Sequence, residues 1–304
     1  MAEATTRAKR RPLRVGIQLP EVVSMARRAD DAGFDAVWFG EHLLYRFADG
    51  TSRGPWEAWS MLAAIAASTS RIRLGPLVAC TAFHNPAVLA KQADTLDEIS
   101  GGRFVLGLGA GWNETEFRAF GIPFDHRIDR FEEAFTIIRT LLQEGAIDFQ
   151  GSYYSARDCE LRPRGPTPGG PPLLIGSTGE RMLSITAPHV DAWNAWYADT
   201  NNSPDGVAGL RERVDAACRT AGRDPAEIDR TVAVLVRLSG GTGRVQGEAS
   251  RPSPKPLSGA PGAIADGLRA YAAEGISEVQ LVLDPITEAA IDELAPVLGL
   301  LDED

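Results

Sequence analysis

The chain has 304 residues, of which 44% are hydrophobic and 24% charged, and its formal net charge at pH 7 is −10. This composition excludes a disordered, collagen-like or coiled-coil chain, and the length allows one large α/β barrel or two smaller domains. The acidic balance excludes nucleic acid and anionic membrane as main partners, because no basic field is present to hold phosphates.

The apolar runs and the cysteines indicate a cytoplasmic protein. No apolar run reaches the ~20 residues of a membrane span, and the polar, basic residues 1–11 lack the core of a signal peptide. The cysteines Cys80, Cys159 and Cys218 are odd in number and widely spaced, which fits a reducing compartment. We therefore expect a cytoplasmic location.

Strand-like runs alternate with helix-period runs along the chain. The first helix is expected at 22–32, and Pro55 and Pro86 are each well placed to begin one of the next two. Eight βα units in one chain predict a single (β/α)8 barrel of α/β class rather than a doubly wound sheet. The strands are predicted at 13–20, 35–40, 71–80, 103–109, 172–176, 190–196, 231–238 and 277–283.

No linker divides the chain into two halves. We expect a disordered tail at 1–12 followed by one barrel domain at 13–304. The Gly/Pro-rich segment 145–172 is interpreted as an insertion, and the Pro-rich stretch 251–261 as a mobile loop in the seventh unit. Because barrel chemistry lies at the C-terminal ends of the strands, each strand end is a candidate site.

The second and third strand ends carry the reactive side chains. Glu41 and His42 follow strand 2, where a histidine can exchange a proton near neutral pH, or can be an ordinary hydrogen-bonded loop residue. Cys80 ends strand 3 and is expected to be a small buried hydrophobe rather than a nucleophile. His84 is expected to be structural, because Asn85 and Pro86 follow it as a helix start.

The next two strand ends are rich in glycine. Strand 4 ends at Gly107, Gly109 and Gly111, which allows a close approach of the backbone to a flat or anionic group, or forms a tight turn covered by Trp112. This spacing is not the Rossmann fingerprint. Strand 5 ends in the segment 176–181, where a helix start predicts either an anion site or simple capping by a hydroxyl side chain.

Strand 6 carries Trp193 and Trp196 on opposite faces, since side chains alternate along a strand. We expect one to pack under a helix and Trp196 to line a pocket, with Trp56 adding apolar wall. The histidines at 42, 84, 126 and 189 are scattered, so no metal site is predicted.

Four segments together resemble the bacterial luciferase-like oxidoreductases, and within them the branch that uses the deazaflavin coenzyme F420. The segments are 13–20, 33–44, 70–124 and 258–283, and the resemblance extends over about 13–301. The stretch 70–124 is its most specific part.

The resemblance implies a barrel of the bacterial-luciferase-like type, with the ring of the cofactor over the centre of its mouth. His42 would lie beside the reactive face of the ring and Glu41 at the usual acidic position. A non-prolyl cis peptide would support the ring at Leu77, Val78 or Ala79, next to Cys80. Further cofactor contacts would come from Gly109, Ala110, Gly111, Trp112, Asn113 and Thr115. The phosphate of the cofactor would be held by Gly176, Ser177, Thr178 and Gly179.

The implied reaction is hydride transfer between coenzyme F420 and a small organic substrate, at a C=C, C=N or carbonyl/alcohol group. His42 would act as acid or base, and Gln18, Trp56 and Trp196 would contact the substrate. The alternative cofactor is FMN, in a two-component monooxygenase that uses O2 and reduced flavin. A separate flavin or F420 reductase would supply the reduced cofactor, and a homodimer is possible by analogy with most relatives.

Two further classes remain as alternatives: a relative that binds flavin without turnover, and a glycosidase, for which Glu41 lacks a second carboxylate at another strand end.

The sequence departs from the family in a short loop after strand 1 and in the absence of a lysine-rich patch for the acidic tail of F420. Arg46, Arg53 or Arg181 would have to bind that tail. The substrate is expected to be chosen by loops 43–56, 145–172 and 239–260.

Overall fold

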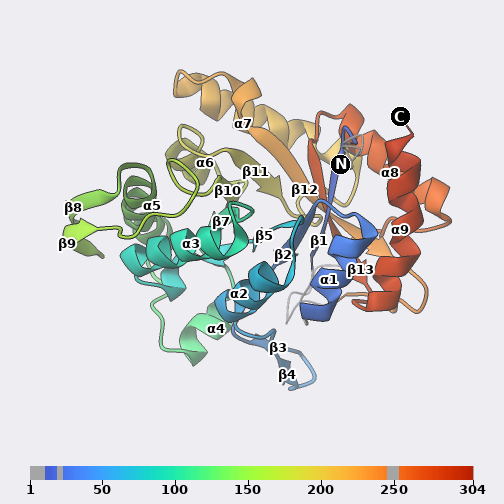
Figure 1. Cartoon of the computed structure of the whole chain (residues 1–304), viewed down its shortest axis with the longest axis horizontal. Coiled ribbons are helices and arrows are strands. Elements are labelled where there is room, and N and C mark those ends of the chain that lie inside the picture. The colour runs from blue at the N-terminus through green and yellow to red at the C-terminus, as the bar shows by residue number, and fades with distance from the viewer. Residues whose placement is uncertain (1–10, 19–22, 245–252, 304) are drawn as a thin grey trace, which may run out of the picture.

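The computed structural model describes residues 11–18, 23–244 and 253–303, and these form a parallel barrel with helices around it (Figure 1). β1 pairs with β2 on one side and with β13 on the other, so the first and last barrel strands are neighbours and the ring is nearly closed. The predicted fold class is confirmed. The barrel strands are β1 (Arg14–Gln18), β2 (Ala36–Phe39), β5 (Arg73–Pro76) with β6 (Ala79–Cys80), β7 (Leu106–Gly109), β10 (Leu173–Gly176), β11 (Ala192–Ala195), β12 (Asp229–Arg237) and β13 (Glu278–Asp284).

β5 and β6 are two halves of the third barrel strand. β5 pairs with β2, β6 pairs with β7, and the cis peptide bond between Leu77 and Val78 separates the halves. This bond lies where the family resemblance placed it. With the halves counted as one strand, the ring has eight, and β10 is the fifth in chain order, as the sequence predicted.

The helices begin where capping side chains are available. Asn85 caps α3 by accepting from the backbone N–H groups of Ala87 and Val88, as its place before Pro86 predicted. The second helix begins at Ala58 rather than at Pro55, because Glu57 caps it. The helices are α1 (Val23–Ala32), α2 (Ala58–Ser68), α3 (Pro86–Ser100), α4 (Glu114–Ala119), α5 (Arg127–Glu144), α6 (Glu180–Thr186), α7 (Ala208–Thr220), α8 (Pro261–Ala273) and α9 (Glu288–Asp302).

The main hydrophobic core lies between the ring of strands and the helices. On β12, Val232, Val234 and Val236 belong to this outer core, whereas Ala233 and Leu235 face the barrel interior. This alternation follows the period of two along a strand. The interior holds two small apolar clusters and the buried pair Asn194 and Gln280, in which Asn194 Nδ2 donates to Gln280 Oε1 at 2.7 Å.

Charged groups close the N-terminal end of the barrel. The carboxylate of Glu278 on β13 is 1% exposed, accepts from Trp38 Nε1 at 3.0 Å and from Arg14 Nε at 3.1 Å, and also bonds Arg73. These partners come from β1, β2 and β5, so this network ties strands together at the end opposite the mouth.

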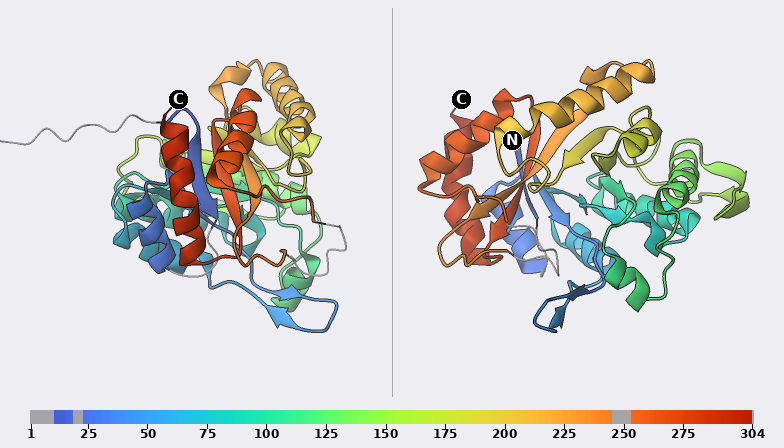
Figure 2. Two further views of the ribbon diagram at one scale, coloured as in Figure 1. Left: turned by 90° about the vertical axis from the view of Figure 1, so that its right-hand side faces the viewer. Right: turned by 180° about the vertical axis from the view of Figure 1, so that it is seen from behind.

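Two hairpins are added to the barrel, and they leave it on different sides (Figure 2). β3 (Tyr45–Arg46) and β4 (Ser52–Arg53) form one after β2. β8 (Ala146–Gln150) and β9 (Ser155–Glu160) form the other, so the segment 145–172, interpreted as an insertion, contains a β-ribbon.

The expected tail and the expected mobile loop differ in part from the structure. Residues 1–10 lie outside the described residues, but Arg11 donates to the Gly33 carbonyl and pairs with Asp302, so the free tail does not extend to residue 12. In the seventh unit, 251–252 lie outside the described residues, and Leu257 pairs with Val236 alongside β12. In the described part of the chain, no helix combines the length and apolar character of a membrane span.

Candidate active site

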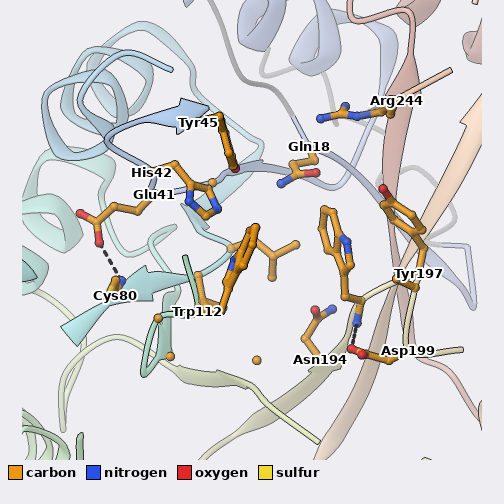
Figure 3. A pocket seen from close by; sticks show the side chains of 18 of the residues that line it. Gln18, Glu41, His42, Tyr45, Cys80, Trp112, Asn194, Tyr197, Asp199 and Arg244 are labelled. Carbon is orange, nitrogen blue, oxygen red and sulfur yellow. Dashed lines mark hydrogen bonds between the residues drawn. The ribbon is translucent and has the colours of Figure 1, made fainter. Parts of the chain in front are cut away.

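A cavity of about 1220 Å³ opens at the C-terminal ends of the strands (Figure 3). Its walls include side chains that follow β1, β2, β6, β7, β10, β11, β12 and β13, so every unit of the barrel contributes. A mouth of this kind is where barrel enzymes bind their ligands. Of the residues singled out in the sequence, it is lined by Gln18, Glu41, His42, Leu77, Val78, Cys80, Gly109, Ala110, Gly111, Trp112, Gly176, Ser177, Thr178, Gly179 and Trp196.

Four of the expected site residues do not line this cavity. Trp56 is 69% exposed, so it adds no wall to the pocket. Ala79 is fully buried in the core behind the mouth. Asn113 donates from Nδ2 to the carbonyl of Leu44, and neither it nor Thr115 belongs to the lining.

His42 is fixed by a buried carboxylate that the sequence did not reveal. Its Nδ1 lies 3.0 Å from Oε1 of Glu116, a residue of α4 that is 1% exposed. The other oxygen, Oε2, accepts from the backbone N–H groups of Leu43 at 2.8 Å and Leu44 at 3.4 Å. Because the carboxylate accepts, the hydrogen of the neutral imidazole lies on Nδ1, and Nε2 is left for a ligand.

Two aromatic rings limit the orientation of the imidazole. The ring of Tyr45 is 4.6 Å from that of His42, and Trp112 meets it edge-on at 5.7 Å. Because both sides of the imidazole are packed and Nδ1 is bonded, its plane is held in one orientation at the pocket wall.

Glu41 is surrounded by protein donors. Its carboxylate accepts from the backbone N–H of Cys80 at 2.7 Å and from Trp59 Nε1 at 2.8 Å, and it lies 2.7 Å from His84 Nε2. This arrangement connects the end of β2 to the end of β6. Glu41 therefore holds the two strand ends together rather than transferring a proton to a substrate. His84 has a structural role as one of its partners, as the sequence predicted.

The thiol of Cys80 is suppressed as a nucleophile. Burial, reinforced by the charge of Glu41, raises its pKa well above the ordinary thiol range. A thiol in this state does not ionise near neutral pH. Its geometry therefore agrees with the expectation of a small buried hydrophobe.

The glycines at the ends of β7 and β10 make room for Val78. A Cβ atom at Gly109 would come within 2.7 Å of Val78 Cγ2, and one at Gly176 within 2.9 Å of Val78 Cγ1. Real Cβ contacts are not this short, so these two positions require glycine for packing. Val78 thereby forms the floor of the cavity. The group that comes close to the backbone at these glycines is the side chain of Val78.

The two tryptophans of the sixth barrel strand have the opposite orientations that were predicted. Trp193 packs in the outer core and donates from Nε1 to the carbonyl of Ser177 at 2.7 Å, which fixes the loop after β10. Trp196 lines the cavity, and its backbone N–H donates to Asp199 at 3.3 Å. The helix after this loop is capped at Gly179, so neither Ser177 nor Thr178 is its cap.

Sequence reasoning also missed several lining residues besides Glu116. Asn194 is two residues before Trp196 on the same face of β11, so strand alternation could have identified it. Tyr45, Arg127, Tyr197 and Arg244 lie in loops or at a helix start, where periodicity gives no signal. For Arg244, the rule that strand ends carry chemistry could have been applied to strand 7, which it follows.

The three arginines that were considered for binding the acidic tail of F420 lie in different surroundings. Arg53 lines the cavity and Arg46 does not. The charge of Arg181 is already balanced by Asp129 and Glu132. The described residues contain no cluster of three His, Cys, Asp or Glu side chains that could hold a metal ion.

Comparisons with known proteins agree with this architecture. Residues 3–246 match the model of the luciferase-like monooxygenases. The chain belongs to this luciferase-like family. Its members include oxidoreductases and monooxygenases. One of the solved structures similar to this chain is an F420-dependent secondary alcohol dehydrogenase in complex with an F420-acetone adduct. The TM-score is 0.81, and the identity is 17% over 95% of this chain and 99% of that one.

Curated relatives of this family member fall into two groups. One is the 5,10-methylenetetrahydromethanopterin reductase of Archaeoglobus fulgidus, 32% identical over 203 residues, which are 67% of this chain and 56% of the relative. The other is the pyrimidine monooxygenase RutA of Cronobacter sakazakii, 33% identical over 173 residues, 55% of this chain and 50% of the relative. The chain thus matches little more than half the length of these relatives.

Proposed function

We propose that this luciferase-like protein is a coenzyme F420-dependent oxidoreductase that transfers hydride between the deazaflavin and a small organic substrate. The observation that carries the proposal is the imidazole of His42, held by the buried carboxylate of Glu116 at the wall of the cavity. Reduction of a carbonyl or imine by hydride needs a proton at the neighbouring heteroatom, and a fixed imidazole supplies one near neutral pH.

The cavity suits a flat tricyclic ring. Val78 provides an apolar floor at the centre of the barrel, Trp112 and Trp196 belong to the walls, and the volume of about 1220 Å³ exceeds that of a ring system alone. The remaining space is available for a substrate on the face of the ring. Binding sites of this type are mostly apolar with a few placed polar groups.

The polar side chain of the cofactor would leave the ring past Ala110 and Gly111 toward the loop 176–179. Arg127 lies on this side of the cavity, where it donates to the carbonyl of Gly111. Backbone N–H groups of the loop, and the hydroxyls of Ser177 and Thr178, would meet the phosphate. In a chain with a net charge of −10, Arg127 is the cation best placed for this anionic segment.

When bound, the deazaflavin supplies the hydride that is exchanged with the substrate. His42 then gives a proton to the substrate heteroatom in the reducing direction, and takes it from the alcohol or amine in the reverse direction. Glu116 holds the imidazole in place and stabilises its cationic form. The aromatic walls orient the substrate and exclude water from the site.

A second candidate is an FMN-dependent two-component monooxygenase, and the similarity to the pyrimidine monooxygenase favours it. A separate reductase would then supply reduced flavin. Binding of the two cofactors to the purified chain distinguishes the two candidates.

Titration of the purified chain with F420 and with FMN, followed by fluorescence quenching, tests the proposal. We expect saturable binding of F420 and a clearly weaker binding of FMN. Ser177→Ala and Arg127→Gln should weaken F420 binding, whereas Arg46→Gln, which removes a charge outside the cavity, should not. Tight binding of FMN without binding of F420 would instead support the monooxygenase.

A further inference from the structure

The wall of the cavity contains a cation in the segment after β12. Arg244 follows β12 and lines the cavity, and its guanidinium donates from Nη1 to the carbonyl of Leu283 at 3.1 Å. Among the residues that the structure describes, no carboxylate forms an ion pair with it. A guanidinium has five N–H donors, so Arg244 has donors beyond its bond to Leu283 that a ligand in the cavity can use.

The carboxylates of the same cavity are already bonded within the protein. Glu41 and Glu116 have the donors described above. Asp284 accepts from the backbone N–H of Gly243 at 2.8 Å and from Arg237 Nε at 3.3 Å. Asp199 accepts from the backbone N–H of Trp196. The negative charges are therefore bonded to protein donors, whereas Arg244 forms no ion pair with a carboxylate of the described residues.

Two tyrosines near Arg244 are also hydrogen-bond donors. Tyr45 and Tyr197 interact electrostatically with it, together with Asp284 and Arg53. Burial raises the pKa of both phenols, so they stay protonated and can donate a hydrogen bond. Burial also lowers the pKa of Arg244, which reflects the cost of a charge that has lost water without gaining a full partner.

A second unpartnered polar group lies in the same region. Gln18, at the end of β1, is 8% exposed and lines the cavity, and its Oε1 is buried with no hydrogen-bond partner. In the view of Figure 3, Gln18 lies between His42 and Arg244. Buried amide groups are seldom left unbonded in a protein, so this carboxamide points to a polar ligand in the space beside it.

We infer that the substrate carries an anionic group with equivalent oxygens, a carboxylate or a phosphate, which Arg244 binds, with Tyr45 and Tyr197 as supporting donors. The reacting carbon then lies between this anchor and His42, next to Gln18. This assignment rests on the proposed function, because it names the substrate class for the same site. It also separates the tasks of two lining arginines: Arg127 would bind the cofactor and Arg244 the substrate.

Calorimetric titration of the cofactor-free chain with benzoate, phenyl phosphate and the neutral benzamide tests the inference. We expect one of the anions to bind more tightly than benzamide. Arg244→Gln should weaken binding of that anion about 10–100-fold, as expected for loss of a charge-assisted pair of hydrogen bonds, and leave benzamide unchanged. The stronger of benzoate and phenyl phosphate identifies the anion.

Two further variants keep the test independent of folding and of the cofactor. Arg244→Lys keeps the charge without the planar fork and should retain part of the affinity. Arg46→Gln, which removes a charge outside the cavity, should leave anion binding unchanged. Equal binding of benzoate, phenyl phosphate and benzamide, or a loss of anion binding in Arg127→Gln but not in Arg244→Gln, would overturn the assignment. Failure of F420 to bind would reject the proposed cofactor while leaving this result interpretable.

Discussion

At the scale of single residues, the site depends on a histidine whose position is set by side chains distant in sequence. His42 follows β2, and Glu116 is on α4, 74 residues further along the chain. The two backbone N–H groups that also bind Glu116 belong to the residues just after His42. One carboxylate therefore orders both the imidazole and the loop that carries it.

Replacement of His42 should separate catalysis from binding. We expect His42→Ala to lower kcat by about 10²–10⁴-fold, the usual size of general acid–base assistance, with little change in the Kd of the cofactor. The measurement is steady-state turnover together with a fluorescence titration. His189→Ala, an exposed histidine outside the cavity, serves as the control. Unchanged turnover in His42→Ala would remove this residue from the mechanism.

Glu116 should act through His42 rather than on the substrate. Glu116→Gln keeps the size of the side chain but removes the charge that stabilises a cationic imidazole. We expect a fall in kcat with KM and cofactor affinity unchanged, and no additional loss when it is combined with His42→Ala. A full additional loss in the double variant would show that Glu116 has a separate role.

At the scale of elements, three strands meet at one side chain. The tips of β7 and β10 can pack around Val78 only because Gly109 and Gly176 have no side chains. The glycine spacing was visible in the sequence, but it was interpreted as space for a ligand. The residue that fills the space is on another strand, and a pattern within one strand does not reveal its neighbour.

The packing around Val78 can be tested by a double-mutant cycle. Gly109→Ala should destabilise the fold by about 1–3 kcal/mol, because the new Cβ overlaps Val78. Val78→Ala in the same chain should recover part of that loss. Urea denaturation followed by circular dichroism measures both. Gly179→Ala is the control, since a Cβ there meets no atom within 4 Å. Independent, additive effects of the two substitutions would contradict the contact.

At the scale of the whole molecule, hydrophobic periodicity was sufficient to predict a single barrel and the order of its strands. Strand and helix patterns are local, so they survive in the sequence. The site was predicted only in part. His42 and Trp196 follow from their place at strand ends, whereas Arg244 and Glu116 enter the cavity from segments without a period. Trp56 was misplaced, because its side chain is exposed to solvent outside the cavity.

The two ends of the barrel should respond differently to mutation. Glu278→Gln removes a buried charge from two arginines at the N-terminal end, so we expect a loss of about 3–5 kcal/mol in the free energy of unfolding. Cofactor affinity of the folded fraction should not change, because the network is at the end opposite the cavity. Denaturant titration and F420 binding measure the two effects. Asp292→Asn, in an exposed pair with Arg28, is the control and should leave stability and F420 affinity unchanged. A loss of F420 affinity in Glu278→Gln that matches its loss of stability would contradict the independence of the two ends.

The pairing of β1 with β13 has a consequence for the synthesis of the protein. Arg14 lies opposite Glu278, so the strand made almost first can complete its hydrogen bonds only after nearly the last strand has left the ribosome. Until then both edges of an open sheet are exposed, and Gln18 has not been brought opposite the segments after β12. The mouth of the barrel can therefore be completed only after β13 has been made.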